Sequence, residues 1–489
     1  MGRWLPPIAC AFTGALAVAG FAPLYLFPLP LAALAVLAWA GGRAPSPLRA
    51  AGLGFAFGAG FFLAGVSWVY VSLHDFGAMP APLAAVATLL FCVFLALFPA
   101  AASYAHKRCG ASAHAAGLLA FAAVWTLAEW TRGWIFTGFP WLALGYSQVP
   151  SSPLAGYAPL VGVYGVSLLG ALSAVLVLKP RPWRIAVLVA IWAAGFALRQ
   201  VAWTEPAGEA VSVSLLQGNI AQDMKWREDQ VRATLVTYLQ LVRESRSRLI
   251  VLPETALPLF EHSVPRDYLD ALAQHARANH GDILIGLPEQ PGPREYYNSV
   301  LSLGTAPKQV YRKSHLVPFG EFVPLGALLG PVVAALAIPL TDFSRGAPDQ
   351  RPLAVAGQRV AVDVCYEDAF GEEIIRQLPQ ASLLVNVSNV AWFGDSIAPQ
   401  QHLQISQMRA LETGRYMLRA TNTGMTAIVD PHGTVEQAAP AFTRTMVTGT
   451  VRGYAGETPY VRWGNAPALA LAALLLGVAL WLARGPGAR

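Results

Sequence analysis

Charged residues are scarce in this 489-residue chain. Lys, Arg, Asp and Glu together make up 13% of the residues, whereas hydrophobic residues make up 55%. The mean hydropathy of +0.45 is too high for an ordinary soluble protein of this size. The formal net charge of +6 is small for the length, and the basic residues form no long runs, so no nucleic-acid partner is expected. The composition predicts a membrane protein.

Cysteine and histidine are also few, and neither follows the spacing of a metal site. Of the four cysteines, Cys10 and Cys92 lie in apolar stretches, Cys109 follows "HKR", and only Cys365 lies in the polar part of the chain. They suggest no disulfide framework and include no CxxC pair. The nine histidines include no HExxH motif. We therefore expect no metal and no cofactor.

Apolar segments dominate the first 200 residues, and each is close to the ~20 residues that cross a bilayer. A cleaved signal peptide could explain the first segment, but no clear small-residue cleavage site follows it, so we expect an uncleaved helix. The candidate spans are 7–24, 26–41, 51–73, 81–104, 112–130, 156–178, 183–199 and 466–483. The sequence thus predicts an α-helical transmembrane bundle of about eight helices.

Every second boundary of these spans carries Lys or Arg. Basic residues precede the first span, lie between spans two and three, four and five, and six and seven, and follow the eighth. Short loops rich in Lys and Arg stay in the cytoplasm, so we expect both termini there. The segment after the seventh crossing then faces the periplasm, if the source is a Gram-negative bacterium with this protein in its inner membrane.

A long polar segment, 203–460, lies between the seven helices expected in 1–202 and the last helix and cytoplasmic tail in 461–489. Short β-rich runs such as "SRLIVLPETA", "KQVYRKSHL" and "RVAVDVCYE" predict strands. Helix patterns begin at Glu228, Pro265 and Gln401, and the last one, "QHLQISQMRALETGRYMLRA", extends to Ala420. Strands that alternate with helices predict an α/β domain in which helices cover the sheet faces.

Cys365 ends one of these strand patterns, "RVAVDVCYEDAF". Val360, Val362 and Val364 share one face, so a turn after Val364 places the sulfur at the carboxyl edge of the strand, where α/β sheets usually bind ligands. A buried structural cysteine is the alternative, because free cysteine is among the most buried residue types. The polar residues that follow, "YED", favour a reactive thiol.

Two other strand ends offer the groups that a thiol nucleophile needs, a base and a cation. Glu254 follows the apolar run "LIVLP", and Lys313 follows "QVYR", with Glu321 eight residues further on. Each could be a solvated loop charge. Three strand ends that supply complementary groups of one mechanism favour a shared active site.

These motifs resemble a known set. Glu after "LP", Lys in "YRKSHLVPFGEFVP" and Cys in "CYE" are similar to the Glu-Lys-Cys triad of the nitrilase superfamily, whose fold is an αββα sandwich. With spans before and after the domain, the chain resembles the apolipoprotein N-acyltransferases, membrane-embedded members of that superfamily. The resemblance covers nearly the whole chain and includes "GFAPL", "GFPW", "LGYSQ", "QGNIAQDMKW", "WFGDS" and the stretch 401–424.

The resemblance implies that Cys365 is the nucleophile, Glu254 the general base and Lys313 the cation that stabilises the oxyanion. One position departs from the family pattern: Val390 stands in "VSNVAWFG" where the family usually has Asp, beside the loop of Trp392. The supporting and substrate-binding residues that the resemblance implies are Trp226, Asn298, Glu321, Tyr366, Glu367 and Trp392.

The implied reaction has two acyl transfers. Cys365 takes an acyl chain from a phospholipid such as phosphatidylethanolamine, and the thioester then acylates the α-amine of a diacylated apolipoprotein. Both substrates carry acyl chains, so the apolar segment 324–343 is expected to be a membrane-dipping arm or lid, rather than a core helix or a ninth span. "FPW" at 139–141, with Trp134 and Tyr146, predicts an interfacial aromatic belt. We expect a monomer.

Three alternatives stay open at this stage. A membrane-tethered nitrilase-type amidase would use the same triad, although eight spans exceed what a tether needs. A transporter with an extramembrane binding module would need ionisable groups within the spans, and few are present. His315 or His402 could pair with Cys365 in place of Glu254 and Lys313.

Overall fold

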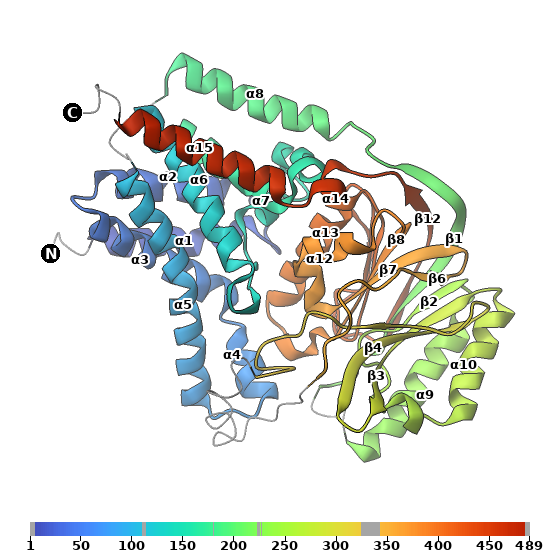
Figure 1. Cartoon of the computed structure of the whole chain (residues 1–489). Helices are drawn as coiled ribbons and strands as arrows, with labels where there is room; N and C mark the ends of the chain where they lie inside the picture. The colour runs from blue at the N-terminus through green and yellow to red at the C-terminus, as the bar shows by residue number, and fades with distance from the viewer. Residues whose placement is uncertain are drawn as a thin grey trace. The chain divides into compact units, whose positions relative to one another are not determined.

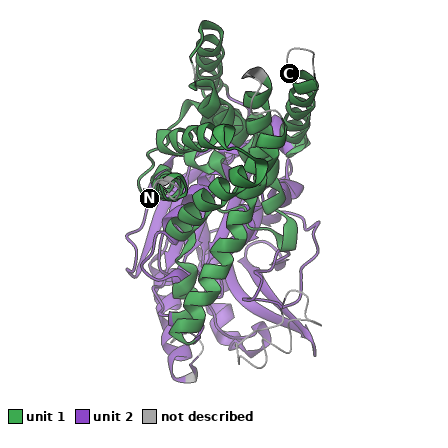
Figure 2. Cartoon of the chain, turned by 90° about the vertical axis from the view of Figure 1, so that its left-hand side faces the viewer, with its two compact units in different colours: residues 1–74, 80–201, 462–489 green, residues 75–79, 202–461 purple. Residues whose placement is uncertain are grey.

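The chain forms two compact units (Figure 1, Figure 2). The computed structural model describes residues 5–109, 114–178, 180–222, 225, 227–323 and 343–484. The first unit contains Met1–His74, Pro80–Val201 and Arg462–Arg489, and the second contains Asp75–Met79 and Ala202–Val461. The short segment Asp75–Met79, which separates two apolar helices in sequence, thus belongs with the second unit.

The first unit is helical. Pro lies in the first turn of several helices, where its missing N–H costs no hydrogen bond, and the Ser46 hydroxyl caps one of them by accepting from the Arg49 N–H. Its longer helices are α1 (Leu5–Ala17), α2 (Pro28–Arg43), α3 (Pro47–Val66), α5 (Ala81–Arg108), α6 (His114–Arg132), α7 (Ala158–Leu176), α8 (Pro182–Leu198) and α15 (Ala466–Arg484), with the short α4 (Val69–Val71) before α5.

Four helical segments among the described residues are long and apolar enough to cross a bilayer. They are Pro47–Val66, Ala81–Arg108, Pro153–Leu176 and Ala466–Arg484. Pro6–Gly20 and Pro182–Leu198 are apolar but shorter. A helical unit with segments long and apolar enough to cross a membrane is therefore confirmed, whereas the number of crossings stays a prediction.

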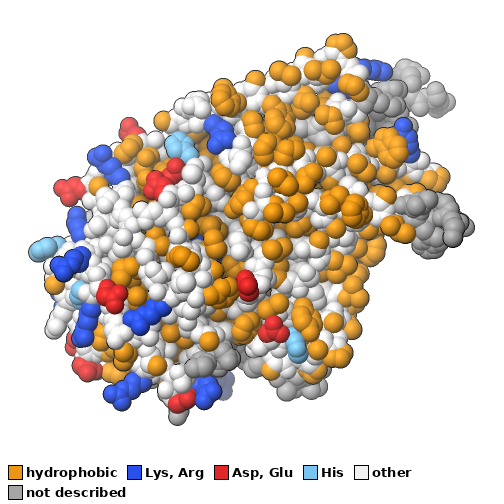
Figure 3. Space-filling model, turned by 180° about the vertical axis from the view of Figure 1, so that it is seen from behind, with side chains coloured by type: hydrophobic (Ala, Val, Ile, Leu, Met, Phe, Trp, Pro, Cys, Tyr) orange, Lys and Arg blue, Asp and Glu red, His pale blue; other side chains and the backbone are white. Residues whose placement is uncertain are grey.

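Large hydrophobic side chains are exposed on several helices of this unit, and Figure 3 shows a broad field of hydrophobic surface with few charges. Such a field is too extensive for a water-facing surface and fits contact with lipid. Examples are Ile8, Phe12, Trp39, Leu90, Leu97, Val189, Phe196, Leu474 and Trp481. The predicted aromatic belt was wrong in part, because Trp141 and Tyr146 are buried while Trp134 is exposed.

The second unit contains two six-stranded sheets. The first has the order β12-β1-β2-β3-β4-β5 and the second the order β11-β10-β9-β8-β7-β6. The strands of the first are β1 (Glu205–Gln217), β2 (Leu249–Val251), β3 (Asp282–Gly292), β4 (Glu295–Gly304), β5 (Gln309–Arg312) and β12 (Thr445–Ala455). Those of the second are β6 (Leu353–Val355), β7 (Gln358–Val364), β8 (Leu383–Ser388), β9 (Met417–Thr421), β10 (Ala427–Val429) and β11 (Val435–Ala438).

Helices cover the outer face of each sheet (Figure 1). The amphipathic α9 (Glu228–Glu244) and α10 (Arg266–Ala278) pack on the first sheet, and α12 (Gly371–Ile374) and α13 (Ala398–Thr413) pack on the second, with α14 (Pro459–Trp463) following β12. Between the sheets lies an aliphatic core that contains Val360, Val362 and Val364, as their alternation predicts. Burying each valine stabilises the fold by roughly 1.5–3 kcal/mol. The αββα sandwich is confirmed.

One predicted helix was too long. The helix expected over 401–420 ends at Thr413, because Gly414 adopts the left-handed conformation (φ 63°) that terminates helices. Residues Met417–Thr421 then form β9, which is buried between β8 and β10. Strands β6, β11 and β12 were also missed by the sequence patterns.

Candidate active site

Glu254, Lys313 and Cys365 each follow the carboxyl end of a strand. In the first sheet, β2 and β3 are parallel and β4 is antiparallel to both β3 and β5, so β2 and β5 run in the same direction. Glu254 follows β2 and Lys313 follows β5, at one edge of this sheet. Cys365 follows β7 of the second sheet, in the short 3₁₀ turn Cys365–Ala369.

Glu254 receives hydrogen bonds from both sheets. The side-chain amide of Asn298, on β4, donates to its Oε1 at 2.7 Å, and the backbone N–H of Asn389, just after β8, donates to its Oε2 at 2.7 Å. The Nζ atom of Lys313 lies 3.7 Å from Oε1. With only 7% of the residue exposed, Glu254 is held in one orientation.

Lys313 is buried between two carboxylates. Its Nζ lies 3.0 Å from Oε1 and 2.9 Å from Oε2 of Glu321 and is also near Glu254. Asn298 donates to Glu321 Oε1 at 3.1 Å, and the backbone N–H of Val317 donates to Oε2 at 2.8 Å. The predicted residues Asn298 and Glu321 therefore join Glu254 and Lys313 in one network.

A second buried lysine, Lys225, was missed by the sequence analysis. Its Nζ donates to the backbone carbonyl of Glu254 at 3.2 Å, and only 2% of the residue is exposed. Burial lowers the pKa of Lys225 to about 8, against the attraction of Glu254 and Cys365, which acts to raise it. Trp226, the predicted supporting residue next to it, lies outside the described residues.

Cys365 occupies a strained turn. Its φ of 56° is in the left-handed region, which costs a residue other than glycine about 1–3 kcal/mol. Such strain is typical of sites where the surrounding structure imposes a geometry for function. The thiol interacts electrostatically with Glu254 and Lys313, so the structure brings the predicted nucleophile, base and cation together.

The charge states of these groups follow from their surroundings. Burial and the charge of Glu254 raise the pKa of the Cys365 thiol, against the opposing effect of Lys313. Burial acts to raise the pKa of Glu254, but Lys313, Asn298 and Lys225 outweigh it and the pKa is lowered. Burial acts to lower the pKa of Lys313, but Glu321 and Glu254 raise it above its usual value. At neutral pH the site therefore holds a thiol, a carboxylate and an ammonium.

Glu367 connects the strand end of Lys313 to that of Cys365. Its Oε1 accepts from the N–H and hydroxyl of Ser314, at 2.7 and 3.0 Å, and from the N–H of His315 at 2.9 Å. Its Oε2 accepts from the N–H of Val364 at 2.7 Å and from the hydroxyl of Tyr311 at 3.0 Å. One buried carboxylate thus binds β5 and its following loop to the end of β7.

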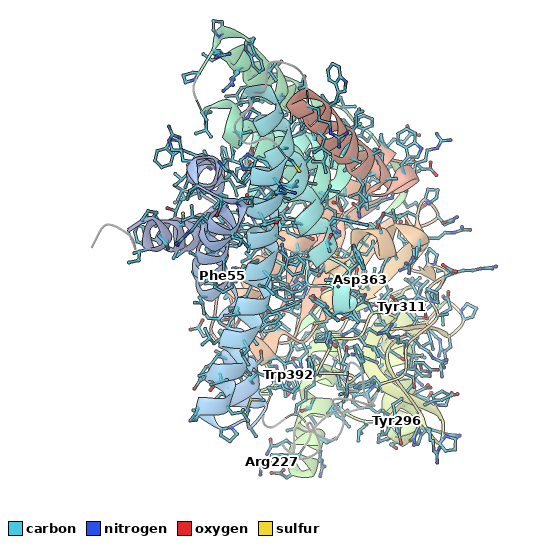
Figure 4. The ribbon with its side chains drawn as sticks, turned by 60° about the vertical axis from the view of Figure 1, so that its left-hand side comes forward. Phe55, Arg227, Tyr296, Tyr311, Asp363 and Trp392 are labelled. Carbon is cyan, nitrogen blue, oxygen red and sulfur yellow. The ribbon has the colours of Figure 1, made fainter. Side chains whose placement is uncertain are left out.

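The two predicted aromatic residues differ in exposure and have different ring neighbours. Tyr366 is buried, with its ring 5.1 Å from that of Phe370. Trp392, labelled in Figure 4, is 40% exposed, and its ring is 6.4 Å from that of Phe76. Val390, at the position where the family pattern has Asp, is buried.

The two histidines have other partners than the sulfur of Cys365. The Nε2 of His402 lies 2.7 Å from Oδ1 of Asp368 and 3.2 Å from the backbone carbonyl of Cys365. Both partners are acceptors, so Nε2 carries the proton and is not the base that receives one from the thiol. The Nδ1 of His315 lies 3.1 Å from Glu373. The geometry favours Glu254 as the base.

Within the described residues, no group of three or more His, Cys, Asp or Glu side chains could hold a metal ion. The predicted arm or lid over 324–343 lies outside the described residues apart from Phe343, whose N–H donates to the carbonyl of Glu321 at 2.9 Å.

The sequence is similar to known proteins over both units. Residues 13–176 match a family model described as the apolipoprotein N-acyltransferase N-terminal domain, and residues 212–460 match one described as carbon-nitrogen hydrolase. A protein of Nitrosomonas europaea named apolipoprotein N-acyltransferase is 56% identical over 486 residues, covering 97% of each chain. Proteins of the same name from Chromobacterium violaceum and Ralstonia nicotianae are 47% and 45% identical, covering 98% and 99% of this chain and 94% and 95% of theirs.

Proposed function

Because the chain belongs to the apolipoprotein N-acyltransferase family, we propose that Cys365 carries a fatty acyl group from a phospholipid to the N-terminal amine of a lipoprotein. Lipoprotein N-acylation is the activity of the family, and the donor, the intermediate and the catalytic residues are our proposal. The observation that carries it is the convergence of Glu254, Lys313 and Cys365 in a buried network. A carboxylate, an ammonium and a thiol close enough to interact electrostatically are the groups that acyl transfer through a thioester requires.

In the first transfer, the sulfur of Cys365 attacks the ester carbonyl of the phospholipid while its proton passes to Glu254. The tetrahedral oxyanion forms next to Lys313, whose positive charge stabilises it. When the intermediate collapses, the carbon–oxygen bond breaks, and Glu254 returns the proton to the leaving alkoxide. The products are a lysophospholipid and an acyl thioester on Cys365.

In the second transfer, the α-amine of the diacylglyceryl-cysteine attacks the thioester carbonyl. Glu254 accepts a proton from the amine nitrogen and passes it to the sulfur of Cys365 as the carbon–sulfur bond breaks. The amide bond formed is more stable than the thioester broken, which drives the transfer. Because Glu254 is a carboxylate and Cys365 a thiol before each cycle, the enzyme returns to its starting charge state.

The supporting residues act through these three groups. Asn298 and Glu321 orient Glu254 and Lys313, and Glu367 fixes the loop of Lys313 to the turn of Cys365. We assign Tyr366, Trp392 and Trp226 to substrate binding, by resemblance to the family. Donor phosphatidylethanolamine and a diacylated apolipoprotein are the substrates that we expect.

In the membrane, we propose that 1–202 and 461–489 supply the crossings, about eight in all, and that 203–460 is the catalytic domain. Both termini lie in the cytoplasm and the catalytic domain faces the periplasm, as the alternation of basic loops predicts. The exposed apolar side chains of the helical unit support its contact with lipid. We expect the enzyme to act as a monomer.

Intact-mass measurement after incubation with phosphatidylethanolamine tests the proposal. We expect one acyl adduct that hydroxylamine removes, present in the Cys109→Ala control and lost in Cys365→Ala. Transfer to a diacylated lipopeptide should yield a triacylated product. An adduct that persists in Cys365→Ala would overturn the assignment of the nucleophile.

A further inference from the structure

A closed polar cluster lies beneath the turn of Cys365, between the second sheet and α13. It is made of Asp363 and Asn386 on neighbouring strands, Asp368 in the turn, His402 on α13 and Arg419 on β9, all at most 2% exposed. Asp363 is labelled in Figure 4. The three reacting groups of the proposed mechanism do not include these residues. Burying so many polar groups is costly unless hydrogen bonds and ion pairs compensate for the lost water, and the members of this cluster bind one another in that way.

Two members of this polar cluster converge on the nucleophile's own backbone. The side-chain amide of Asn386 donates to the carbonyl oxygen of Cys365 at 3.1 Å, and the Nε2 of His402 lies 3.2 Å from the same oxygen. The donors come from different elements, β8 and α13. A carbonyl held from two directions cannot rotate freely, so the left-handed conformation of Cys365 is restrained by side chains far away in the sequence.

The remaining contacts fix the two donors. Asp368 accepts from the Ser406 hydroxyl at 2.6 Å and from Arg419 at 3.1 Å, and it pairs with His402 at 2.7 Å. Arg419 also donates to Oδ1 of Asn386 at 2.7 Å, which orients the amide so that its nitrogen faces Cys365. Asp368 thus fixes the orientation of the His402 ring, and Arg419 fixes that of the Asn386 amide.

Burial and neighbouring charges shift the pKa values of the titratable side chains in the polar cluster. Burial acts to raise the pKa of Asp368, but His402 and Arg419 outweigh it and lower the pKa, so this side chain is a carboxylate. Burial and the charge of Asp368 raise the pKa of Asp363 well above its ordinary value. Burial and Arg419 lower the pKa of His402, against the opposing effect of Asp368. Asp368 and Arg419 form a fully buried ion pair at 3.1 Å within the cluster.

We propose that Asn386 and His402 are positioning residues that hold the carbonyl of Cys365 and so keep its sulfur aimed at the acyl carbonyl. The inference rests on the proposed role of Cys365 as the nucleophile. Without these donors the turn can relax out of its strained conformation, and the sulfur moves relative to Glu254 and Lys313. A displacement of about 1 Å in a reacting atom can slow the chemical step about 100-fold.

The test compares two substitutions of one residue in the full-length enzyme. In His402→Asn the side chain is too short to reach the carbonyl of Cys365, whereas the amide nitrogen of His402→Gln can take the place of Nε2. We expect His402→Asn to form the acyl thioester roughly 10- to 100-fold more slowly, with the KM for phosphatidylethanolamine changed less than about twofold. His402→Gln should recover to within about threefold of the wild-type rate.

A matched control removes the same kind of hydrogen bond elsewhere. The Nε2 of His275, on α10, lies 2.8 Å from the backbone carbonyl of Ser245, and His275→Asn should lower the melting temperature without slowing thioester formation. Alkylation of Cys365 by iodoacetamide gives a second readout, and it should slow in His402→Asn but not in His275→Asn.

The outcomes separate this inference from the proposed function. If the wild type forms the thioester on Cys365 and His402→Asn does so at the same rate, the positioning role is wrong and the nucleophile stands. If His402→Gln is as slow as His402→Asn, the bond to the carbonyl is not the cause. Should His402→Asn not fold, Asn386→Thr removes the other donor, and a wild-type rate in that variant also rejects the proposal.

Discussion

At the residue scale, the charges around Cys365 compensate one another. Glu254 and Glu321 supply two carboxylates, and Lys313 and Lys225 supply two ammonium groups, all with little exposure. If Cys365 lost its proton to solvent, the thiolate would give the site an excess negative charge in a medium of low dielectric constant. Passing the proton from Cys365 to Glu254 keeps the total constant, which explains why the thiol needs a base in direct reach.

Lys225 should limit the reaction at alkaline pH. Its pKa of about 8 means that the ammonium is present below pH 8 and is lost as the pH rises through that value. The negative charge that develops on the sulfur and the substrate oxygen then loses one stabilising cation. We expect the rate of thioester formation to fall above about pH 8 in the wild type, and this fall to shift to higher pH in Lys225→Arg.

Two further variants complete that experiment. Lys225→Met should be roughly tenfold slower at pH 7 and show no fall near pH 8. Lys308→Met, which removes an exposed lysine paired with Glu261 at the opposite end of β5, should match the wild type. If the rate of thioester formation falls at the same pH in Lys225→Arg as in the wild type, a group other than Lys225 is titrating.

The sequence could predict the strand-end residues but not all their partners. Glu254, Lys313 and Cys365 each follow a recognisable strand, so their placement at sheet edges follows from local patterns. Lys225 and Asn389 contact Glu254 across 29 and 135 residues of chain. No local pattern encodes a distance between loops, so only the packing of the two sheets could reveal them.

At the scale of elements, the close approach of β3 to the segment after β2 positions Glu254. A Cβ added at Gly286, on β3, would lie 2.2 Å from the carbonyl oxygen of Pro253 and 2.8 Å from the Cα of Glu254. Only glycine permits this approach. The orientation of the base therefore depends on a residue that has no side chain.

Gly286→Ala should displace Glu254 and reduce activity. We expect thioester formation to slow by tenfold or more, with a loss of about 1–3 kcal/mol in the free energy of unfolding from overpacking. Gly292→Ala, on the same strand, is the control, because its nearest neighbour would be Glu295 at 3.4 Å, an ordinary contact. Single-turnover rates and melting curves check both, and equal rates in the two variants would contradict the steric argument.

The sandwich could be predicted from the alternation of strands and helices, whereas its strand count could not. The run after Gly414 reads as a continuation of α13 because Met417, Leu418 and Ala420 are apolar at spacings that suit a helix or a buried strand. The outcome is decided by neighbours. Strands β8 and β10 pair with the two edges of β9, Leu418 lies in the core between the sheets, and Met417 lies in the cluster that includes α13. Burial in a sheet thus overrides local pattern.

At the scale of the whole molecule, lipid contact follows from the surface of the helical unit. In the most apolar 18-residue stretch of each helix, only 17% of α15 and 28% of α5 are buried within the protein. The corresponding stretch of Pro153–Leu176 is 78% buried. Exposed apolar helices of this length are stable only where lipid replaces water. The buried segment then forms the centre of the bundle, and the exposed ones its periphery.

Orientation in the membrane can be measured by labelling single cysteines. Glu209, on β1, and Arg181, before α8, are both exposed, so a cysteine at either position can react with a maleimide. In a chain whose four cysteines are replaced by alanine, we expect a membrane-impermeant maleimide added to spheroplasts to label Glu209→Cys and not Arg181→Cys, because basic loops stay in the cytoplasm. Both should react after solubilisation in detergent. Labelling of Arg181→Cys alone would show that the orientation is opposite to the one proposed. Labelling of both cysteines would show that the two positions lie on the same side of the membrane, so that an even number of crossings separates them.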